Sequence, residues 1–178
     1  RARYGKLSSI EKNGPSDLVT DADFASETEI VATIRAAFPD HAIVAEESGV
    51  RDGAAEWLWL VDPLDGTVNY AHQVPFFAVS IACVQGDEGR LGVVLNPVSG
   101  ELFTARSGGG ARLNGQPIRV GPETRVSESL LATGFPYDLG PGFKRLTQRF
   151  LRCLRAARGV RRLGSAALDL CFVACGRF

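Results

Sequence analysis

Hydrophobic side chains recur every three to four residues in three stretches of the chain, and this spacing predicts amphipathic helices. The first stretch covers residues 24–38, where Ile30 and Ile34 mark the buried stripe. A second helix is predicted for residues 143–157, and a third begins near Ser165. Continuous or alternating apolar runs between the helices predict strands. These strands cover residues 42–45, 57–61, 76–84, 91–95, 101–105, 111–113, 117–120 and 129–133.

The order of these helices and strands predicts a layered fold of the α/β or α+β class. Residues 76–84 are apolar on both faces, which indicates a central strand that is covered on both sides. The pair Asn114-Gly115 between two short apolar runs is typical of a β-hairpin. We expect Asp62-Pro63 to end the strand at residues 57–61, because proline has no backbone N–H to donate to a sheet.

The composition is that of one globular domain, with 178 residues, 45% hydrophobic, 22% charged and a formal net charge of zero. The apolar content argues against disorder, and the longest apolar run, residues 74–84, is too short to span a bilayer as a helix. The four cysteines lack the spacing of a zinc site, and neither of the two histidines lies in a nucleophile-elbow context. We therefore expect a cytoplasmic protein with reduced thiols and no membrane contact.

The zero net charge hides an asymmetry between the two parts of the chain. Residues 1–70 carry 13 acidic and 6 basic side chains, whereas residues 71–178 carry 7 acidic and 14 basic ones. An acidic segment suggests cation binding, and a basic segment suggests an anionic partner. The basic stretch at residues 144–162 fits either a solvated helix face or a nucleic-acid surface, although no recognition motif accompanies it.

The segment with the clearest chemistry reads Asp-Pro-Leu-Asp-Gly-Thr-Val-Asn-Tyr and covers residues 62–70. A hydrophobic strand delivers Asp62 at its end, and Asp65 follows where its carboxylate can turn back beside the first. The carbonyl of Leu64 is free to face the same point, and two carboxylates with a carbonyl suit a hard cation such as Mg²⁺. Gly66 and Thr67 then open a short helix whose amides attract an anion, so that a phosphate could lie beside the cation.

Two further acidic segments precede this one. Glu46 follows the strand at residues 42–45, as Asp62 follows the next, although a pair of solvated glutamates would look the same. The earlier segment, residues 17–23, reads Asp-Leu-Val-Thr-Asp-Ala-Asp and offers several helix N-caps, which on its own is only a good helix start. The three acidic segments together favour a metal-assisted phosphate chemistry over turn residues alone.

These segments, in this order, resemble the inositol monophosphatase family. The resemblance rests on Asp-x-Val-Thr-x-x-Asp, then Glu-Glu-Ser, then the segment at residues 62–70, and on Gly-Ser-Ala-Ala-Leu-Asp at residues 164–169. It implies a layered αβαβα sandwich of the inositol monophosphatase and sugar bisphosphatase type, with Mg²⁺ as cofactor. Two or three ions are expected in the complete site.

The resemblance also assigns roles to residues. Glu46, Asp62 and the Leu64 carbonyl would hold one metal ion, Asp62 and Asp65 would share a second, and Glu46 would help to hold a third. Thr67, paired with Asp23, would act with Glu46 to activate the attacking water. The phosphate would meet the amides of Gly66 and Thr67. The alcohol part of the substrate would meet Asp65, Ser165 and Ala166.

The resemblance further implies a small phosphorylated polyol as substrate, inositol 1-phosphate above all, and a homodimer. Histidinol-phosphate or a sugar phosphate would suit other members of the family, and some bacterial members associate with RNA polymerase. The family also has an N-terminal helix and a later Trp-Asp segment that supplies a further metal ligand. We expect the 178 residues to form one phosphatase domain that lacks this C-terminal segment and leaves an apolar face exposed.

Overall fold

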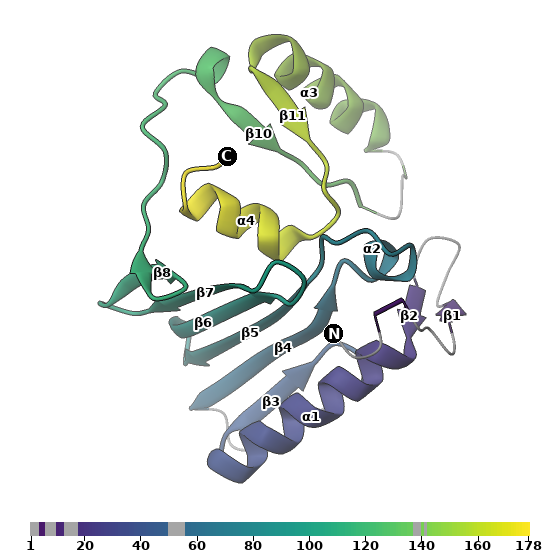
Figure 1. Cartoon of the computed structure of the whole chain (residues 1–178), viewed down its shortest axis with the longest axis vertical. Coiled ribbons are helices and arrows are strands. Elements are labelled where there is room, and N and C mark those ends of the chain that lie inside the picture. The colour runs from purple at the N-terminus through teal and green to yellow at the C-terminus, as the bar shows by residue number, and fades with distance from the viewer. Residues whose placement is uncertain (1–3, 6–9, 13–17, 50–55, 137–139, 141) are drawn as a thin grey trace.

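A seven-stranded sheet forms the centre of the computed structural model, which describes residues 4–5, 10–12, 18–49, 56–136, 140 and 142–178 (Figure 1). The helices are α1 (Asp21–Ala37), α2 (Thr67–Ala71), α3 (Phe143–Ala156) and α4 (Ala166–Ala174), with a 3₁₀ turn η1 (Val126–Glu128). The strands are β1 (Ile10–Lys12), β2 (Leu18–Thr20), β3 (Ala42–Ala45), β4 (Trp57–Asp65), β5 (Ala78–Gln85), β6 (Glu88–Asn96), β7 (Glu101–Arg106), β8 (Gly110–Leu113), β9 (Gln116–Pro117), β10 (Leu130–Ala132) and β11 (Gly159–Arg161).

The sheet runs in the order β3-β4-β5-β6-β7-β8-β9, with β3 parallel to β4 and every later pair antiparallel. Helix α1 covers one face, where Ile34 packs in a cluster with Trp59 and Cys83. Helix α4 covers the opposite face, where Leu168 packs on Ala78 and Phe103. Strand β5 is therefore covered on both sides, as its apolar pattern predicted. These layers confirm the predicted α/β class.

Strand β4 continues beyond the point where the sequence predicted its end. It pairs with β5 through Asp62 opposite Ser80 and again through Asp65 opposite Ala78, so β4 has one residue more than β5 between these pairs. This is a β-bulge, and Pro63 sits inside it, where a missing N–H removes no ladder hydrogen bond. The predicted strand end at Asp62-Pro63 was wrong. The bulge changes the direction of the chain between Asp62 and Asp65, which carry the acidic side chains.

Most other predicted elements are confirmed, and their ends differ by a few residues. Helix α1 begins at Asp21 because Thr20 and Asp23 form a capping box. The Asp23 carboxylate accepts a hydrogen bond from the Thr20 N–H, and the Thr20 hydroxyl accepts one from the Ala22 N–H. The strand predicted at residues 117–120 is only the two residues of β9. Strand β11 was not predicted, because three residues carry too short a pattern.

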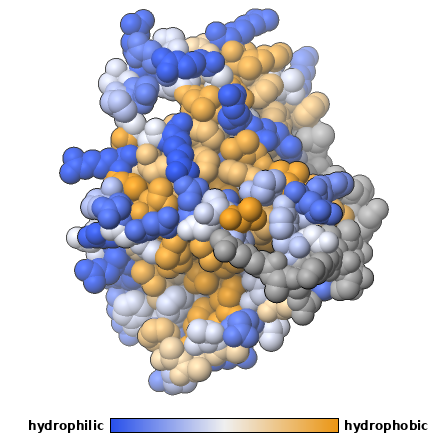
Figure 2. Space-filling view, viewed as in Figure 1, coloured by the Kyte–Doolittle hydropathy of each residue, from blue (hydrophilic) through white to orange (hydrophobic). Residues whose placement is uncertain are grey.

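A smaller unit lies at the other end of the molecule from α1 (Figure 1). Here β10 and β11 pair in parallel, and α3 packs on β11. Helix α3 buries no residue, and Phe143, Leu151 and Leu154 are each more than 40% exposed. Figure 2 shows long hydrophilic side chains projecting over apolar surface at this end.

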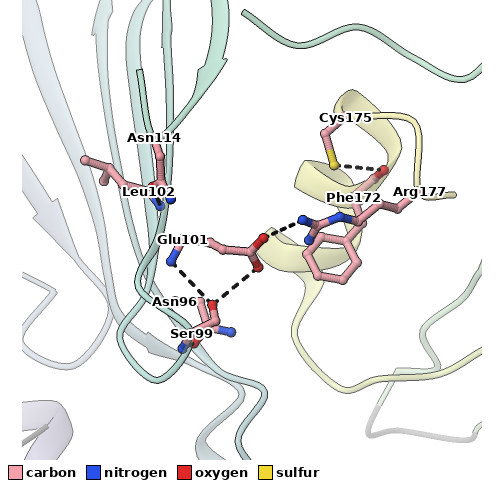
Figure 3. A network of polar contacts seen from close by, with 8 residues as sticks. All are labelled: Asn96, Ser99, Glu101, Leu102, Asn114, Phe172, Cys175 and Arg177. Atoms are coloured by element: carbon pink, nitrogen blue, oxygen red, sulfur yellow. Dashed lines mark hydrogen bonds and ion pairs between the residues drawn. The ribbon is translucent and has the colours of Figure 1, made fainter. Parts of the chain in front are cut away.

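The C-terminal end of α4 is fixed to the sheet by an ion pair between Arg177 and Glu101 (Figure 3). Arg177 also lies over the ring of Phe172, with its guanidinium carbon 4.5 Å from the ring centroid. The Arg177 guanidinium lowers the pKa of Glu101 below its ordinary value. The ion pair links the start of β7 to the end of α4 and so helps to hold the helix on its face of the sheet.

None of the helices in the described ranges combines the length and the apolar character that crossing a membrane requires.

Candidate functional site

A cavity of about 730 Å³ opens where the end of β4, helix α2 and the start of α4 meet. Every site residue predicted from the sequence lines it, apart from Asp23, which lies behind Thr67. The lining residues are Leu18, Val19, Glu46, Glu47, Asp62, Leu64, Asp65, Gly66, Thr67, Ala132, Thr133, Gly134, Phe135, Arg162, Gly164, Ser165, Ala166, Asp169, Leu170 and Val173. The structure thus brings the three acidic segments and the Gly-Ser-Ala-Ala segment to one place.

Asp62 lies in the bulge of β4, and its Oδ1 accepts a hydrogen bond of 3.0 Å from the Leu64 N–H. Burial raises the pKa of Asp62 to about 8, with further contributions from the negative charges of Glu46 and Asp65. A hydrogen bond with the Glu46 side chain raises the pKa as well, and the hydrogen bond from the Leu64 N–H offsets only part of the rise. Burial and the neighbouring carboxylates therefore disfavour the charged form of Asp62, and a cation at this point would favour it.

Asp65 holds the N-terminus of α4. Its Oδ2 accepts hydrogen bonds from Ser165 Oγ at 2.5 Å and from the Ala167 N–H at 2.7 Å, and its Oδ1 accepts one from the Ala166 N–H at 3.2 Å. A carboxylate is favoured here because the first amides of a helix have no partner within the helix. The structure thus brings Asp65 beside Ser165 and Ala166 across a separation of 100 residues. In addition, Asp65 joins the sheet to α4.

Thr67 and Asp23 form the predicted pair. Thr67 Oγ1 lies 3.2 Å from Asp23 Oδ1 and 3.0 Å from the Leu64 carbonyl oxygen, so its one proton can go to either. Asp23 is 1% exposed, and its other oxygen accepts hydrogen bonds from the N–H and the hydroxyl of Thr20. Burial raises the pKa of Asp23 above its ordinary value. Asp23 is thus a fixed proton acceptor behind the Thr67 hydroxyl.

Glu27 is a buried acid beside the site that sequence reasoning missed. It is 5% exposed, and its two oxygens accept hydrogen bonds from the Glu47 N–H at 2.8 Å and the Ser48 N–H at 3.0 Å. These bonds fix the turn that carries Glu46 after β3. Glu27 lies four residues after Asp23 on the buried stripe of α1, which Ile34 continues. The sequence did carry a signal for Glu27, because this acid falls on the same face of the predicted helix as the buried apolar residue Ile34.

Two glycines let the chain approach itself closely beside the cavity. Gly66 has a φ of +95°, and a Cβ placed there would lie 3.1 Å from the carbonyl oxygen of Gly164. Gly164 has a φ of +85° and would in turn crowd the Asn69 side chain. The Asn69 amide donates to the carbonyls of Phe76 and Leu163, both at 2.7 Å. Asn69 thereby joins the loop before β5 to the segment before α4.

The donors around Asp62 are of the kind that Mg²⁺ prefers, namely carboxylate and carbonyl oxygens. The Leu64 carbonyl accepts from Thr67 and keeps a second lone pair. Within the described ranges, no three His, Cys, Asp or Glu side chains form a complete cage for an ion. The residues therefore fit Mg²⁺ in donor type and charge, with solvent completing its coordination, which is its usual state in proteins.

Three more residues of the cavity were not singled out as site residues from the sequence. The guanidinium carbon of Arg162 lies 5.8 Å from the centroid of the Phe135 ring. Asp169 lies on α4, and burial together with the charge of Asp65 raises its pKa above the ordinary value. Arg162 and Phe135 come from segments that meet only in the folded chain, so spacing along the sequence carried no signal for them, whereas Asp169 ends the motif at residues 164–169 but received no role.

The layered fold and the acidic cavity are those that the family resemblance implied, and comparison with known proteins identifies the family. A profile described as "Inositol monophosphatase family" matches residues 1–178, and the chain belongs to this family. The Pseudomonas aeruginosa protein "Nus factor SuhB" is 45% identical over 177 residues, which cover 96% of this chain and 65% of that protein. The Synechocystis "Inositol-1-monophosphatase" is 44% identical over 98% of this chain and 61% of its own length.

Among solved structures, the Bartonella henselae extragenic suppressor protein suhB has a TM-score of 0.93 and 39% identity, covering 99% of this chain and 68% of that one. The agreement confirms the predicted fold and family. The chain spans less than two thirds of the length of the two sequence relatives above.

Proposed function

We propose that this protein is a Mg²⁺-dependent phosphomonoesterase that hydrolyses inositol 1-phosphate to inositol and phosphate, with water as the nucleophile. The observation that carries the proposal is the meeting of Glu46, Asp62 and Asp65 with the Thr67–Asp23 pair at one cavity. An acidic cavity alone would repel a phosphate, so a function on phosphate esters requires cations there. Membership of a phosphatase family supports the same reaction.

In this proposal Glu46, Asp62 and the Leu64 carbonyl would hold one ion, and Asp62 and Asp65 would hold a second. Glu46 also helps to hold a weaker third. When bound, such ions lower the pKa of a coordinated water and neutralise charge on the leaving alcohol. The carboxylates set where that water can sit, and the turn fixed by Glu27 keeps Glu46 in place.

The Thr67–Asp23 pair takes the proton of the attacking water. With the Thr67 proton directed to Asp23, a lone pair of Oγ1 is left to accept a hydrogen bond from water in the cavity. The raised pKa of Asp23 makes it a better proton acceptor than a solvated aspartate. Glu46 assists from the end of β3. No covalent intermediate on the enzyme is needed.

The substrate is held at its two ends. The phosphate meets the N–H groups of Gly66 and Thr67, at the start of α2. The alcohol lies toward α4, where Asp65, Ser165 and Ala166 face the cavity.

The test is phosphate release from inositol 1-phosphate, histidinol phosphate and fructose 1,6-bisphosphate by the full chain, with Mg²⁺ and with Mg²⁺ plus chelator. The proposal predicts chelator-sensitive release that is fastest with inositol 1-phosphate. Faster release from histidinol phosphate or the sugar phosphate would replace the substrate and keep the reaction class. Release that a chelator does not reduce would contradict the metal-dependent mechanism.

A second candidate function is binding to RNA polymerase or RNA. The observation that favours it is the surface of α3, where Lys144, Arg145, Arg149, Arg152 and Arg155 are exposed and the helix has no acidic residue. A relative carries the name "Nus factor SuhB". Binding of the full chain to polymerase in the presence of chelator, lost on changing Arg149 and Arg152 to Gln, would support this role. Equal binding by that variant would contradict it.

We further propose that the protein acts as a homodimer in the cytoplasm and that residues 1–178 form one phosphatase domain. The exposed apolar side chains of α3 support the dimer, and the four free cysteines support the location. Light scattering at micromolar concentration measures the mass. A monomer at all concentrations would contradict the dimer.

A further inference from the structure

His41 is a titratable side chain that lies outside the cavity and takes no part in the proposed reaction. It lies in the turn between α1 and β3, where its backbone N–H donates to the Phe38 carbonyl oxygen at 3.2 Å. Its Nδ1 accepts a hydrogen bond of 3.0 Å from the indole Nε1–H of Trp59 on β4. Strand β3 is the last strand on its side of the seven-stranded sheet, next to α1 (Figure 1). The His41–Trp59 bond therefore closes the start of an edge strand against its neighbour.

Aromatic rings surround the His41 imidazole and fix its plane. The ring stacks on Phe38, with the centroids 5.0 Å apart and an interplanar angle of 23°. It also stacks on Trp57, with a centroid distance of 5.5 Å and an angle of 7°. Trp59 is 8% exposed and packs in the core cluster that contains Ile34. Trp59 is thus held in the core, whereas His41 is only half-buried in its turn.

The hydrogen bond from Trp59 requires a neutral His41 ring. A neutral imidazole has one nitrogen that donates and one that accepts, and an indole N–H can only donate. Because Nδ1 accepts here, the ring proton is on Nε2. Protonation puts a second N–H on Nδ1, opposite the indole N–H, and the acceptor is lost. Histidine is the side chain that ordinarily changes its charge between about pH 5 and pH 8.

The surroundings of the two rings determine which of them moves when the bond is lost. Aromatic faces attract an imidazolium, but two opposed N–H groups 3.0 Å apart repel, so the pair cannot keep its geometry. Trp59 is enclosed by the core, and His41 in its turn can reach water, which solvates the charge. The charged groups on the elements around His41 are Arg35 on α1, Asp40 in the turn and Glu56 just before β4. They stay the same in every comparison below, so their effects cancel.

We propose that His41 is a pH-sensitive latch, which in its neutral form holds the turn before β3 to Trp59 and in its protonated form releases it. Release exposes the indole of Trp59 and loosens the start of the edge strand. The inference goes beyond the proposed phosphatase function and does not depend on it, because the latch lies at the opposite end of β3 from Glu46.

Nuclear magnetic resonance of the indole N–H groups tests the latch in the full chain. Trp57 and Trp59 are the two tryptophans of the sequence, so two indole resonances occur, and Trp57→Phe assigns them. Protection of the Trp59 indole proton from exchange, relative to free tryptophan at the same pH, should fall at least about 10-fold from pH 8 to pH 5. The resonance should shift in one step over the same range. Equal protection at both pH values would overturn the inference.

Variants of the two histidines show whether His41 causes the step. His41→Asn puts an amide oxygen near the position of Nδ1 and does not titrate, so protection should persist at both pH values. His41→Phe keeps a ring for stacking without an acceptor, and protection should be low at both. The matched control is His72→Gln, at an exposed site after α2, which should retain the step. A step that persists in His41→Asn would contradict the latch. If His41→Phe does not fold, the wild type and His41→Asn decide.

Quenching of tryptophan emission by acrylamide measures the opening itself. The emission comes from Trp57 and Trp59, which both lie beside His41. The quenching constant should be at least about 2-fold higher at pH 5 than at pH 8 in the wild type, and equal at both in His41→Asn. A constant that does not rise in the wild type would contradict the opening. These measurements use neither Mg²⁺ nor substrate, so a failure of the proposed function leaves them decisive.

Discussion

Helices α1 and α3 are both amphipathic in sequence, yet they meet very different surroundings in the fold. Helix α1 packs on β3 and β4 of the seven-stranded sheet and buries Asp23, Glu27 and Ile34. Helix α3 packs on a two-stranded sheet and buries none of its residues. The same periodicity thus predicts a helix in both places, but the area of the surface beneath it decides how much is buried.

The two helices also differ in where their charged residues lie, near the cavity for α1 and on the outer surface for α3. The buried stripe of α1 changes from Ile34 at its C-terminal end to Glu27 and Asp23 near the cavity. These two carboxylates can be buried because each accepts hydrogen bonds from neighbouring N–H or hydroxyl groups. On α3 the charged residues all point to solvent, and no acid accompanies them. Changes near α1 should therefore alter catalysis, whereas changes on α3 should not.

The largest contrast is expected between Asp62→Asn and the double change of Arg149 and Arg152 to Gln on α3. Asp62→Asn should reduce Mg²⁺-dependent phosphate release at least about 1,000-fold, because the shared ligand of two ions is lost. The α3 variant should stay within about 2-fold of the wild type, since it touches only solvated side chains. Initial rates at saturating Mg²⁺ measure both. Full activity in Asp62→Asn would contradict its role.

A smaller loss of rate is expected from the pair behind the attacking water. Thr67→Ala and Asp23→Asn should each lower kcat about 100-fold, the usual range for general-base assistance. Thr67→Ser keeps the hydroxyl and should stay within about 5-fold of the wild type. The double variant should lose little more than either single one, because the residues act as a unit. Independent, multiplying losses would show that they do not.

The pH dependence of stability tests the uncompensated charge at Asp62. Its pKa in the folded protein, about 8, lies above the ordinary value of 3.8. Between these values the folded state binds more protons than the unfolded state, so the free energy of unfolding should fall as pH rises from about 4 to about 8 and level off above. We expect a fall of about 2 kcal/mol for this partly exposed group, without added metal.

Urea unfolding at pH 5 and pH 8, with and without Mg²⁺, measures this fall. Mg²⁺ should stabilise the protein more at pH 8, where the carboxylate is charged. Asp62→Asn should flatten the dependence on pH. A metal-free protein that is more stable at pH 8 than at pH 5 would contradict the raised pKa.

A loss of stability without a change of chemistry is expected from Glu27. Glu27→Gln leaves one of the Glu47 and Ser48 amides without its acceptor and should lower the free energy of unfolding by about 1–3 kcal/mol. Gln148→Ala, at an exposed site on α3, should change it by less than about 0.5 kcal/mol. Urea unfolding of both variants measures the difference. Equal effects would mean that the buried stripe of α1 does not fix the turn after β3.

The sequence predicted the elements with strong patterns and the residues of one local motif. Strand β3 and the core of α1 follow from apolar spacing, and the cluster of Asp62, Asp65 and Thr67 follows from neighbours in the chain. The approach of Asp65 to Ser165 and Ala166, 100 residues away, came only from the family resemblance. No spacing rule could supply that contact.

The features that the sequence did not reveal depend on the packed sheet. The bulge at Pro63 arises because β4 must pair with β5 on both sides of a residue that cannot donate. Glu27 is recognised only once the turn after β3 is placed against α1. Arg162 and Phe135 meet through the β10–β11 unit, whose second strand has only three residues. Long-range placement, and not residue type, was the missing information.

The central claim is that the carboxylates around Asp62 bind Mg²⁺ and that this binding enables hydrolysis. The most direct measurement is calorimetric titration of Mg²⁺ into the full wild-type chain and into Asp62→Asn, with phosphate release from inositol 1-phosphate followed over the same Mg²⁺ range. The account predicts saturable binding to the wild type, a rate that rises with occupancy, and loss of both in Asp62→Asn. Mg²⁺ binding and hydrolysis that survive in Asp62→Asn would contradict it.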